Sequence, residues 1–416
     1  MNIQKPETIK GCKQFNLADE NFYFYKCEVK INKIHALSYG IDACKAKAKS
    51  KAILEGIERY CACFDKESSK KIVLKSYNEL KNKALHPKFL FSFSKKQYLQ
   101  KNFKFHELKN KTKIYWIKGR SILTNKKIYI PASYVYCDYH IKKHQKKIGH
   151  STSNGCAIAK TINEAILNGA LELIERDSIL INWLKRLPSP KIPLNQLDEK
   201  IKDILVKTQI KYGINILIND QTTDFKIPTI SILSQSKNPP YFTFGSATHF
   251  SPEKAIIKAL QESLLIRKEL SGLKKSSSYQ QHKDLNKIQT LYQHAEFYAL
   301  KNKDDPFEFL LKSPYLKNLR KYRNLEFKYN TPIKQLNYLK NLCQKSKKEI
   351  FYVNLSKNIA EKKGLKAVRV IIPELYPLNS EYDARYLANA RLRSLFPKTK
   401  PKHINKKLNP YPHPIG

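Results

Sequence analysis

The chain has 416 residues, enough for one large domain or two ordinary ones, and its 41% hydrophobic and 11% aromatic content can supply a buried core. This composition excludes a globally disordered protein, and the lack of any run near about 18 apolar residues excludes a membrane-spanning helix. The formal net charge is +43, with 78 Lys and Arg against 35 Asp and Glu. Because the lysines are spread along the chain, as in proteins encoded by AT-rich DNA, we interpret them mainly as solvated surface and expect no nucleic-acid partner.

The first 35 residues form an N-terminal segment without a clear pattern, and they lack the apolar run of a signal peptide. The eight cysteines are scattered, and the only close pair, Cys61 and Cys63, does not have the spacing of metal ligands. We therefore expect a reduced, cytoplasmic protein with no structural zinc.

A first helix is predicted at 43–63, and lysine-rich loops then alternate with strand-like runs such as 127–139. A turn of small residues at 151–159 leads into a second helix, which Thr161 opens as its N-cap. The segment 187–193 breaks the chain with its prolines.

Three strands follow, at 214–220, 227–233 and 241–247. Ser251 is the expected N-cap of a third helix, with Pro252 at its first position. We expect a surface loop at 271–284, then lysine-rich helices, a strand at 366–375, an arginine-rich helix and a basic tail.

Three segments echo one another: "AILEGIERY" (52–60), "ALELIERDS" (170–178) and "ALQESLLIR" (259–267). Each has an alanine and an apolar residue, then glutamate, then arginine. Their separation is too long for a solenoid repeat. We predict three similar helices that bring similar side chains to one place.

The second helix concentrates carboxylates. At about 100° per residue, Glu164, Glu172 and Glu175 share one stripe, whereas Asp177 lies about 200° from Glu175 and is expected to be structural. No lysine occurs between 161 and 184. Crowded carboxylates need a cation, and their oxygens suit Mg²⁺ held together with nucleotide phosphates, to which arginines would donate hydrogen bonds. Two simpler interpretations stay open: Glu164 completes a capping box with Thr161, and the other glutamates form a solvated face or pair with lysines.

These segments, "KSKAILEGIERY", "SNGCAIAKTINEAILNGALELIERDS" and "AIIKALQESLLIR", resemble the YcaO family of ATP-dependent enzymes. The resemblance implies an α+β fold in which mixed or antiparallel sheets pack with helices that carry a glutamate-rich ATP and Mg²⁺ site, within a catalytic domain at 36–396. It implies magnesium ligands at Glu55, Glu58, Glu172 and Glu175. It also implies nucleotide contacts from Glu164, Arg176 and Arg267, with Arg59 and Glu262 as further candidates.

The tail, 397–416, is basic and ends in prolines at Pro410, Pro412 and Pro414. Such a composition by default gives a disordered polyproline end. In the YcaO family, however, it resembles the terminal Pro-x-Pro-x-Pro of azoline-forming cyclodehydratases, which implies that these prolines, His413 and Gly416 enter the active site. His413 is either a base with a near-neutral pKa or a spacer.

The implied activity converts Cys, Ser or Thr of a ribosomally made precursor peptide to a thiazoline or oxazoline, with ATP phosphorylating the backbone amide oxygen. The alternatives are a thioamide- or macroamidine-forming YcaO enzyme and a nucleic-acid- or ribosome-associated binder with the same fold. No leader-binding domain fits in 1–35, so we expect a separate ThiF-like partner, a flavin dehydrogenase in the same complex, and a homodimer.

Overall fold

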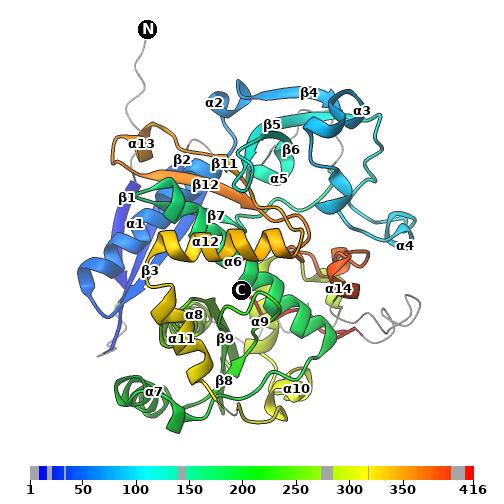
Figure 1. Ribbon diagram of the computed structural model, residues 1–416. Helices are drawn as coiled ribbons and strands as arrows, with labels where there is room; N and C mark the ends of the chain where they lie inside the picture. Colours follow the sequence, from blue (N-terminus) through cyan, green and yellow to red (C-terminus); the bar gives the residue numbers. More distant parts are fainter. Residues whose placement is uncertain are drawn as a thin grey trace.

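The structure, a computed structural model, describes residues 9–15, 21–31, 34–137, 139, 147–272, 284–316, 318–394 and 408–416. Within these residues three antiparallel sheets form (Figure 1). The first has the order β1-β2-β3, from Ile9–Phe15, Tyr23–Ile31 and Ile34–Asp42. The second has the order β10-β9-β8, from Phe242–Thr248, Thr229–Ser236 and Ile214–Asp220. The third runs β4-β5-β11-β12-β7, with β6 beside β5, and its strands are Ile72–Ser76, Lys113–Ser121, Phe351–Asn354, Lys366–Ile371, Cys156–Ala159 and Lys127–Pro131.

Three long helices each begin directly after a strand. They are α1 (Lys45–Ala62) after β3, α6 (Ile162–Lys185) after β7 and α8 (Pro252–Leu270) after β10. Figure 1 shows α6 in the middle of the molecule, between the third sheet and the β8–β10 sheet. The other helices are α7 (Glu199–Tyr212), α9 (Leu291–Ala299), α11 (Arg320–Lys328), α12 (Pro332–Lys345) and the short α2 (Lys66–Ser69), α3 (Tyr77–Leu80), α4 (Lys95–Tyr98), α5 (Ala132–Val135), α10 (Glu308–Leu311), α13 (Asn358–Glu361) and α14 (Arg391–Ser394). The predicted α+β class is confirmed.

The helix boundaries follow the local signals. Thr161 caps α6 by accepting a hydrogen bond from the Glu164 backbone, and Glu164 completes the capping box. Ser251 caps α8, with Pro252 in the first turn, as predicted. These ends were predictable because a cap depends on neighbours within a few residues.

Several strand predictions need correction. The run 127–139 is not one strand: β6 ends at Pro131, and a turn of helix, α5, follows. The strand at 366–375 ends at Ile371. The N-terminal boundary expected at residue 35 falls inside β3. β3 pairs with β2, and β2 pairs with β1, so residues N-terminal to this boundary belong to the first sheet. Most of the loop at 271–284, and 397–407 of the tail, lie outside the described residues.

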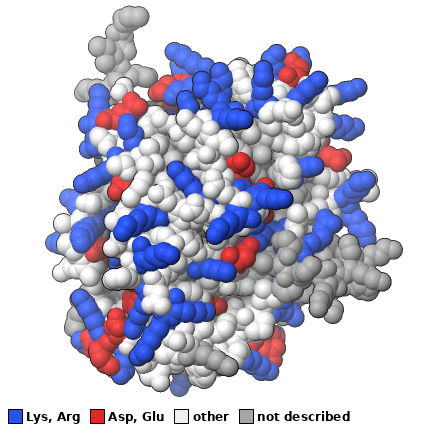
Figure 2. Space-filling view, viewed as in Figure 1, with Lys and Arg blue, Asp and Glu red and all other residues white. Residues whose placement is uncertain are grey.

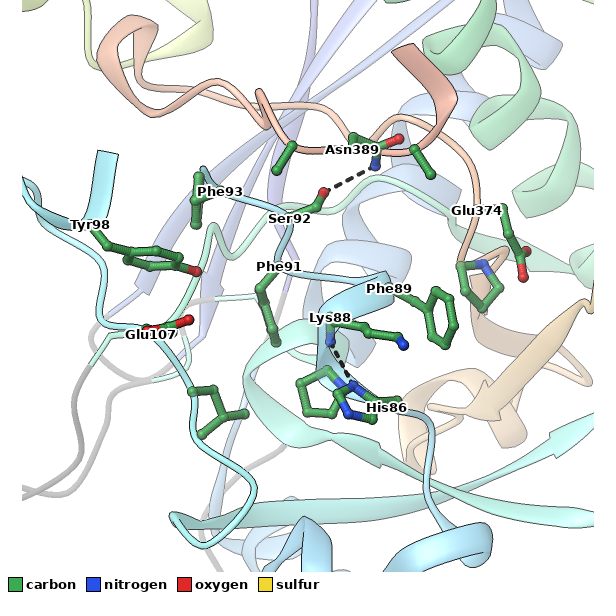
Figure 3. A pocket seen from close by; sticks show the side chains of 15 residues that line it. His86, Lys88, Phe89, Phe91, Ser92, Phe93, Tyr98, Glu107, Glu374 and Asn389 are labelled. Carbon is green, nitrogen blue, oxygen red and sulfur yellow. Dashed lines mark hydrogen bonds between the residues drawn. The ribbon is translucent and has the colours of Figure 1, made fainter. Parts of the chain in front are cut away.

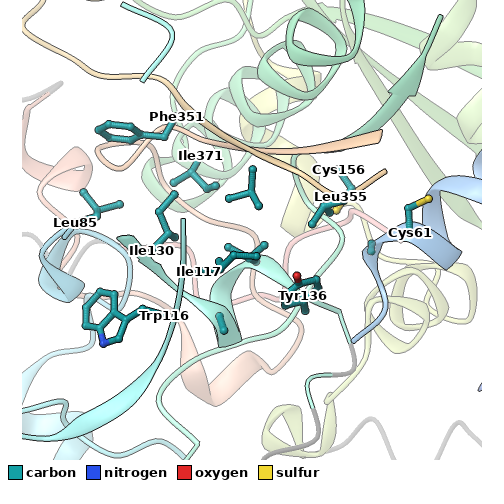
Figure 4. Close-up of a cluster of buried hydrophobic side chains, with 14 of the residues drawn as sticks. Cys61, Leu85, Trp116, Ile117, Ile130, Tyr136, Cys156, Phe351, Leu355 and Ile371 are labelled. Atoms are coloured by element: carbon teal, nitrogen blue, oxygen red, sulfur yellow. The ribbon is translucent and has the colours of Figure 1, made fainter. Parts of the chain in front are cut away.

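Buried apolar side chains account for the absence of lysine from residues 162–184 of α6. This helix is buried over most of its length and contributes to two hydrophobic clusters, one with β12 and α12 and one with the aromatic residues around Trp183. A further cluster fills the third sheet around Trp116, Ile130 and Phe351 (Figure 4). The helix α6 is therefore a core element, and an acid buried on it is an exception to the rule that charged side chains lie at the surface.

One cysteine, Cys27, is oxidised where a reduced thiol was expected. Cys27 of β2 is disulfide-bonded, and the hairpin register sets it opposite Cys12. The prediction of a fully reduced chain is thus wrong at Cys27. Cys44, Cys61, Cys137, Cys156 and Cys343 carry free thiols.

The charge distribution agrees with a solvated surface. Figure 2 shows lysines and arginines spread over the whole visible face rather than gathered in one patch. No helix in the described ranges is both long enough and apolar enough to cross a bilayer.

Candidate functional site

Two glycines allow α1 and α8 to lie directly against the strands that precede them. A Cβ on Gly40 of β3 would lie 2.0 Å from the Ala48 carbonyl oxygen of α1. A Cβ on Gly245 of β10 would lie 2.1 Å from the Ala259 carbonyl oxygen of α8. Only glycine fits such contacts with helix backbone. The same packing therefore recurs at two of the three echoing helices.

On α1, Glu55 is fixed by two contacts. The backbone N–H of Tyr39 donates to its Oε2 at 2.8 Å, and Nη2 of Arg59 lies 3.1 Å from its Oε1. Nη1 of Arg59 donates to the hydroxyl of Ser153 at 2.8 Å, just before β7. Arg59 thus connects the first helix to the turn that precedes the second.

The acids of α6 and α8 meet at Ser246 of β10. Its hydroxyl donates to Oε1 of Glu175 at 2.8 Å, and its backbone N–H donates to Oε2 of Glu262 at 2.6 Å. The backbone N–H of Thr248 donates to the other oxygen of Glu175 at 3.1 Å. Arg176 lies between the two acids, 3.3 Å from each. One strand therefore fixes carboxylates from two helices.

Electrostatic interactions show that the remaining acids lie nearby. Burial raises the pKa of Glu58 well above its usual value, and the neighbouring Cys156 and Glu172 raise it further. Burial likewise raises the pKa of Glu172. For Glu175, burial raises the pKa to about 7; Arg176 opposes this rise, and Glu262 and Glu172 add to it. The structure thus brings together five residues, called here the acid cluster: Glu55, Glu58, Glu172, Glu175 and Glu262.

The donor set of the acid cluster fits magnesium and a polyphosphate. In the described part of the chain no three carboxylate, imidazole or thiol groups stand ready to enclose a metal ion. Mg²⁺ commonly takes only one or two carboxylates and completes its shell with phosphate and water. The Nε atoms of Arg59 and Arg176 are buried without a hydrogen-bond partner, so each arginine has a donor to offer.

Two predicted nucleotide residues are placed differently. Glu164 sits at the exposed start of α6, where its carboxylate accepts from the Thr161 N–H at 3.2 Å, so the capping-box interpretation holds. Arg267 faces the sheet under α8: Nη1 donates to the Pro240 carbonyl at 2.9 Å and Nη2 to the Ser234 carbonyl at 3.4 Å. The structure does not bring Arg267 to the acid cluster.

The end of the tail, 408–416, is docked into the molecule rather than extended into solvent. Pro412, His413 and Pro414 are buried, while Pro410 and Gly416 are exposed. The Tyr411 carbonyl accepts from Nε1 of Trp183 on α6 at 3.2 Å. The alternative of a free polyproline end is therefore wrong for these residues.

His413 anchors the tail. Its ring stacks on that of His294 from α9 at 3.9 Å, and its Nε2 lies 2.8 Å from the Asn379 carbonyl. Nδ1 of His294 lies 3.0 Å from the His413 carbonyl. Burial holds the pKa of His413 well below its usual value, and the charges of His294 and Arg176 act in the same direction. The tail therefore lies within electrostatic range of Arg176, which contacts Glu175 and Glu262, and the His413 imidazole is neutral.

Asp177 is structural, as its position on α6 predicted. It is fully buried, and Arg391 donates to both of its oxygens, at 3.0 and 2.7 Å. Its Oδ1 also accepts from the Tyr376 backbone at 2.8 Å. This pair ties α6 to the segment just before the tail.

Sequence reasoning missed Ser246 and Tyr39. Both lie beside a strand glycine, in "FGSA" and "SYGID", and only that shared glycine could have indicated them. The hydroxyl of Tyr39 donates to Glu269 of α8 at 2.9 Å, so this residue joins the first and third helices.

A separate cavity of about 400 Å³ lies between the segments 86–108 and 373–390 (Figure 3). Phe89, Phe91 and Phe93 form apolar walls, with the carboxylates of Glu107 and Glu374 among the lining groups. None of its lining residues belongs to the acid cluster or to the tail.

Comparison with known proteins extends these observations. Residues 39–376 match the family model described as YcaO cyclodehydratase, ATP- and Mg²⁺-binding. An uncharacterised protein of Methanothermobacter thermautotrophicus is 23% identical over 272 residues, which cover 64% of this chain and 66% of that protein. An uncharacterised protein in the tfuA 3′ region of Rhizobium leguminosarum bv. trifolii is 26% identical over 159 residues, covering 35% of this chain and 37% of that protein. The chain thus spans less than two thirds of the length of these relatives.

Solved structures share the fold. A heterocyclase in complex with substrate and cofactor superposes with a TM-score of 0.78 at 20% identity, over 98% of this chain and 55% of that one. The E. coli microcin synthetase McbBCD complex matches with a TM-score of 0.64 at 18% identity, over 99% of both chains. The YcaO protein of Methanopyrus kandleri, bound with AMPPCP and Mg²⁺, matches with a TM-score of 0.61 at 12% identity, over 88% of this chain and 86% of that one.

Proposed function

The chain belongs to the YcaO family, and from this membership we propose that it is an ATP-dependent cyclodehydratase that forms azolines in a ribosomally made precursor peptide. The single observation that carries the proposal is the convergence of α1, α6 and α8: five carboxylates and two arginines with free donors meet beside a docked proline tail.

The acid cluster would hold Mg-ATP. Glu55, Glu58, Glu172 and Glu175 would supply the hard oxygen ligands that magnesium prefers. When bound, Mg²⁺ neutralises phosphate charge and favours phosphoryl transfer. Arg59 and Arg176 would donate to the phosphates, which they can do because each retains an unpaired Nε–H. Glu262 would orient Arg176, which it already contacts. Glu164 stays a candidate for a nucleotide contact.

The proposed reaction removes one water from the peptide for each ring. The side chain of a Cys, Ser or Thr attacks the preceding backbone carbonyl, and the oxygen of that carbonyl is phosphorylated by ATP. The attack closes the ring and releases the thiol or hydroxyl proton. Phosphate then leaves the former carbonyl carbon, the ring nitrogen loses its N–H proton, and a C=N bond forms, giving ADP and phosphate. An amide oxygen leaves poorly as hydroxide and readily as phosphate. Arg176 stabilises the charge that develops on the transferring group.

The tail would complete the site. Pro412 and Pro414 are rigid and buried, so they lose little conformational entropy when the tail is ordered. His413 is a spacer in this proposal rather than a base, because both its stacked ring and its Nε2 are used to hold the tail. The exposed terminal Gly416 lies next to Ile266 of α8 and Ala295 of α9 and is the part of the tail that can face a peptide.

Partners are proposed from the family. We expect a precursor peptide, a separate ThiF-like protein that binds its leader, a flavin dehydrogenase in the same complex, and a homodimer. The cytoplasm is the compartment in which such peptides and ATP are both present.

The test is a reconstitution of the chain with its precursor peptide, a leader-binding partner and Mg-ATP. Mass spectrometry should show the loss of one water per modified residue together with ADP formation. An exchange of oxygen for sulfur in the peptide would instead identify a thioamide-forming enzyme. Stoichiometric RNA binding with no ATP turnover would contradict an enzymatic role.

A further inference from the structure

Arg267 of α8 is a buried arginine whose hydrogen-bond acceptors are backbone carbonyls. It is 8% exposed, and none of the carboxylates in the described ranges forms an ion pair with it. Arg59, Arg176 and Arg391 each have a carboxylate partner, which helps to raise the pKa of each. The buried Arg369 donates to the Thr152 carbonyl and to the sulfur of Cys156. For Arg267, burial lowers the pKa to about 10 with nothing to oppose it. An uncompensated buried cation is costly unless an anion can reach it.

The protein provides hydrogen-bond acceptors for only some of the N–H groups of the Arg267 guanidinium. Nη1 and Nη2 donate to the carbonyls of Pro240 and Ser234, which carry no formal charge. Nε is buried and has no hydrogen-bond partner. The side chain therefore keeps both its charge and a donor available.

Arg267 lines a hollow of about 990 Å³ between the end of α7, the β8–β9 sheet and the loop 237–240. Its lining contains a second cation, Lys237, and no acid. The other polar side chains of the lining are neutral: Gln209, Tyr212, Asn215, Gln235, Ser236, Asn238, Ser271 and Asn302. Asp304 accepts a hydrogen bond from the lining residue Gln235 at 3.1 Å but does not itself line the hollow.

We propose that this hollow is a second ligand site that binds an oxyanion, a phosphate or a carboxylate, through Arg267. Charged donors bind oxyanions strongly, and amide and hydroxyl groups complete the shell. The site is separate from the acid cluster, because Arg267 faces the sheet whereas Glu262 of the same helix faces Ser246. It does not depend on the proposed cyclodehydratase activity.

The experiment follows the Nε–H signal of Arg267 by ¹⁵N NMR, and affinity by calorimetry, on the full chain without Mg²⁺ or nucleotide. The two probes are inorganic phosphate and succinate. A response to phosphate assigns a phosphate ligand, and a response to succinate alone assigns a carboxylate. Arg267→Gln should weaken binding roughly tenfold or more. Lys268→Gln, which removes the same charge one residue later outside the lining, should change it by less than about twofold.

A second variant keeps the test open if Arg267→Gln does not fold. Asn238→Asp places a carboxylate at the exposed mouth of the hollow and should weaken anion binding roughly fivefold or more by supplying a competing charge. No response to either probe, or equal binding by wild type and both pocket variants, would overturn the proposal. Neither result would bear on azoline formation, which is measured separately on the peptide.

Discussion

The hydroxyl of Ser246 lies 2.8 Å from Oε1 of Glu175, and through this contact a strand of the second sheet fixes an acid on the central helix. The backbone of the same serine fixes Glu262. Ser246 is therefore the point at which α6, α8 and β10 are aligned.

We expect Ser246→Ala to weaken Mg-ATP binding roughly three- to tenfold, because one hydrogen bond to a charged group is lost. Calorimetry with a non-hydrolysable ATP analogue and Mg²⁺ measures this directly. Ser234→Ala is the matched control: Ser234 is a buried strand serine whose hydroxyl lies 2.8 Å from that of Ser263 and not against a carboxylate. Equal affinity of both variants would remove Ser246 from the site.

Glu175→Gln tests the acid cluster itself. The amide keeps the shape but loses the charge, so we expect affinity for Mg-ATP to fall at least about tenfold. Glu199→Gln, on the exposed start of α7, makes the same change away from the site and should have no effect. If Glu175→Gln binds Mg-ATP like wild type, Glu175 is not a magnesium ligand.

Deletion of Pro410–Gly416 tests the tail. We expect ring formation to be lost while Mg-ATP affinity stays within about threefold, since the tail lies beside the acid cluster without contributing an acid to it. Peptide mass spectrometry and calorimetry give the two readouts. A truncated chain that still forms rings would refute a role for the tail in the reaction.

Asp177→Asn tests the structural pair with Arg391. The substitution removes the Asp177 charge and leaves Asp224 as the remaining carboxylate partner of the buried Arg391, so the free energy of unfolding should fall by about 2 kcal/mol. Urea denaturation measures it. Asp203→Asn is the control, because Asp203 and Lys207 form an exposed pair 2.8 Å apart and should contribute less than about 1 kcal/mol.

The surroundings of Glu381 predict how the stability of the fold depends on pH. It is buried, and although burial raises its pKa, the hydrogen bond and charge of His150, with Lys147 and Ser380, hold it at about 2. Because the pKa in the folded state is below the ordinary 4.5, ionised Glu381 stabilises the fold fully above pH 4.5 and loses this contribution as the pH falls toward 2. We expect a loss on the order of 2 kcal/mol across this range.

Urea denaturation at several pH values checks the loss, with Glu381→Gln as the comparison. The variant should start less stable at neutral pH and show a smaller decline on acidification. Parallel declines in both proteins would show that Glu381 is not the responsible group.

Several features were predictable from the sequence because they depend on near neighbours. The caps at Thr161 and Ser251, the helix periodicity and the glutamate stripe on α6 all arise within a few residues. The structural role of Asp177 followed from its angle around the helix. The three echoing segments predicted that their helices bring similar side chains to one place; the glutamates do lie close together, whereas Arg267 of the third segment lies away from them.

Other features were decided only by tertiary structure, because they depend on residues far apart in the chain. Arg267 shares a helix with Glu262, yet the packing of α8 on its sheet turns it toward Pro240 and away from the acids. Composition by default gives a flexible proline end and the family resemblance implied a docked one; contacts with Trp183 and His294 dock residues 408–416. The sequence by itself determined which helices carry the acids. Contacts between residues far apart in the chain, such as Ser246 with Glu175 and Arg59 with Ser153, decided which of those side chains share one site, because only the packed sheets and helices bring them together.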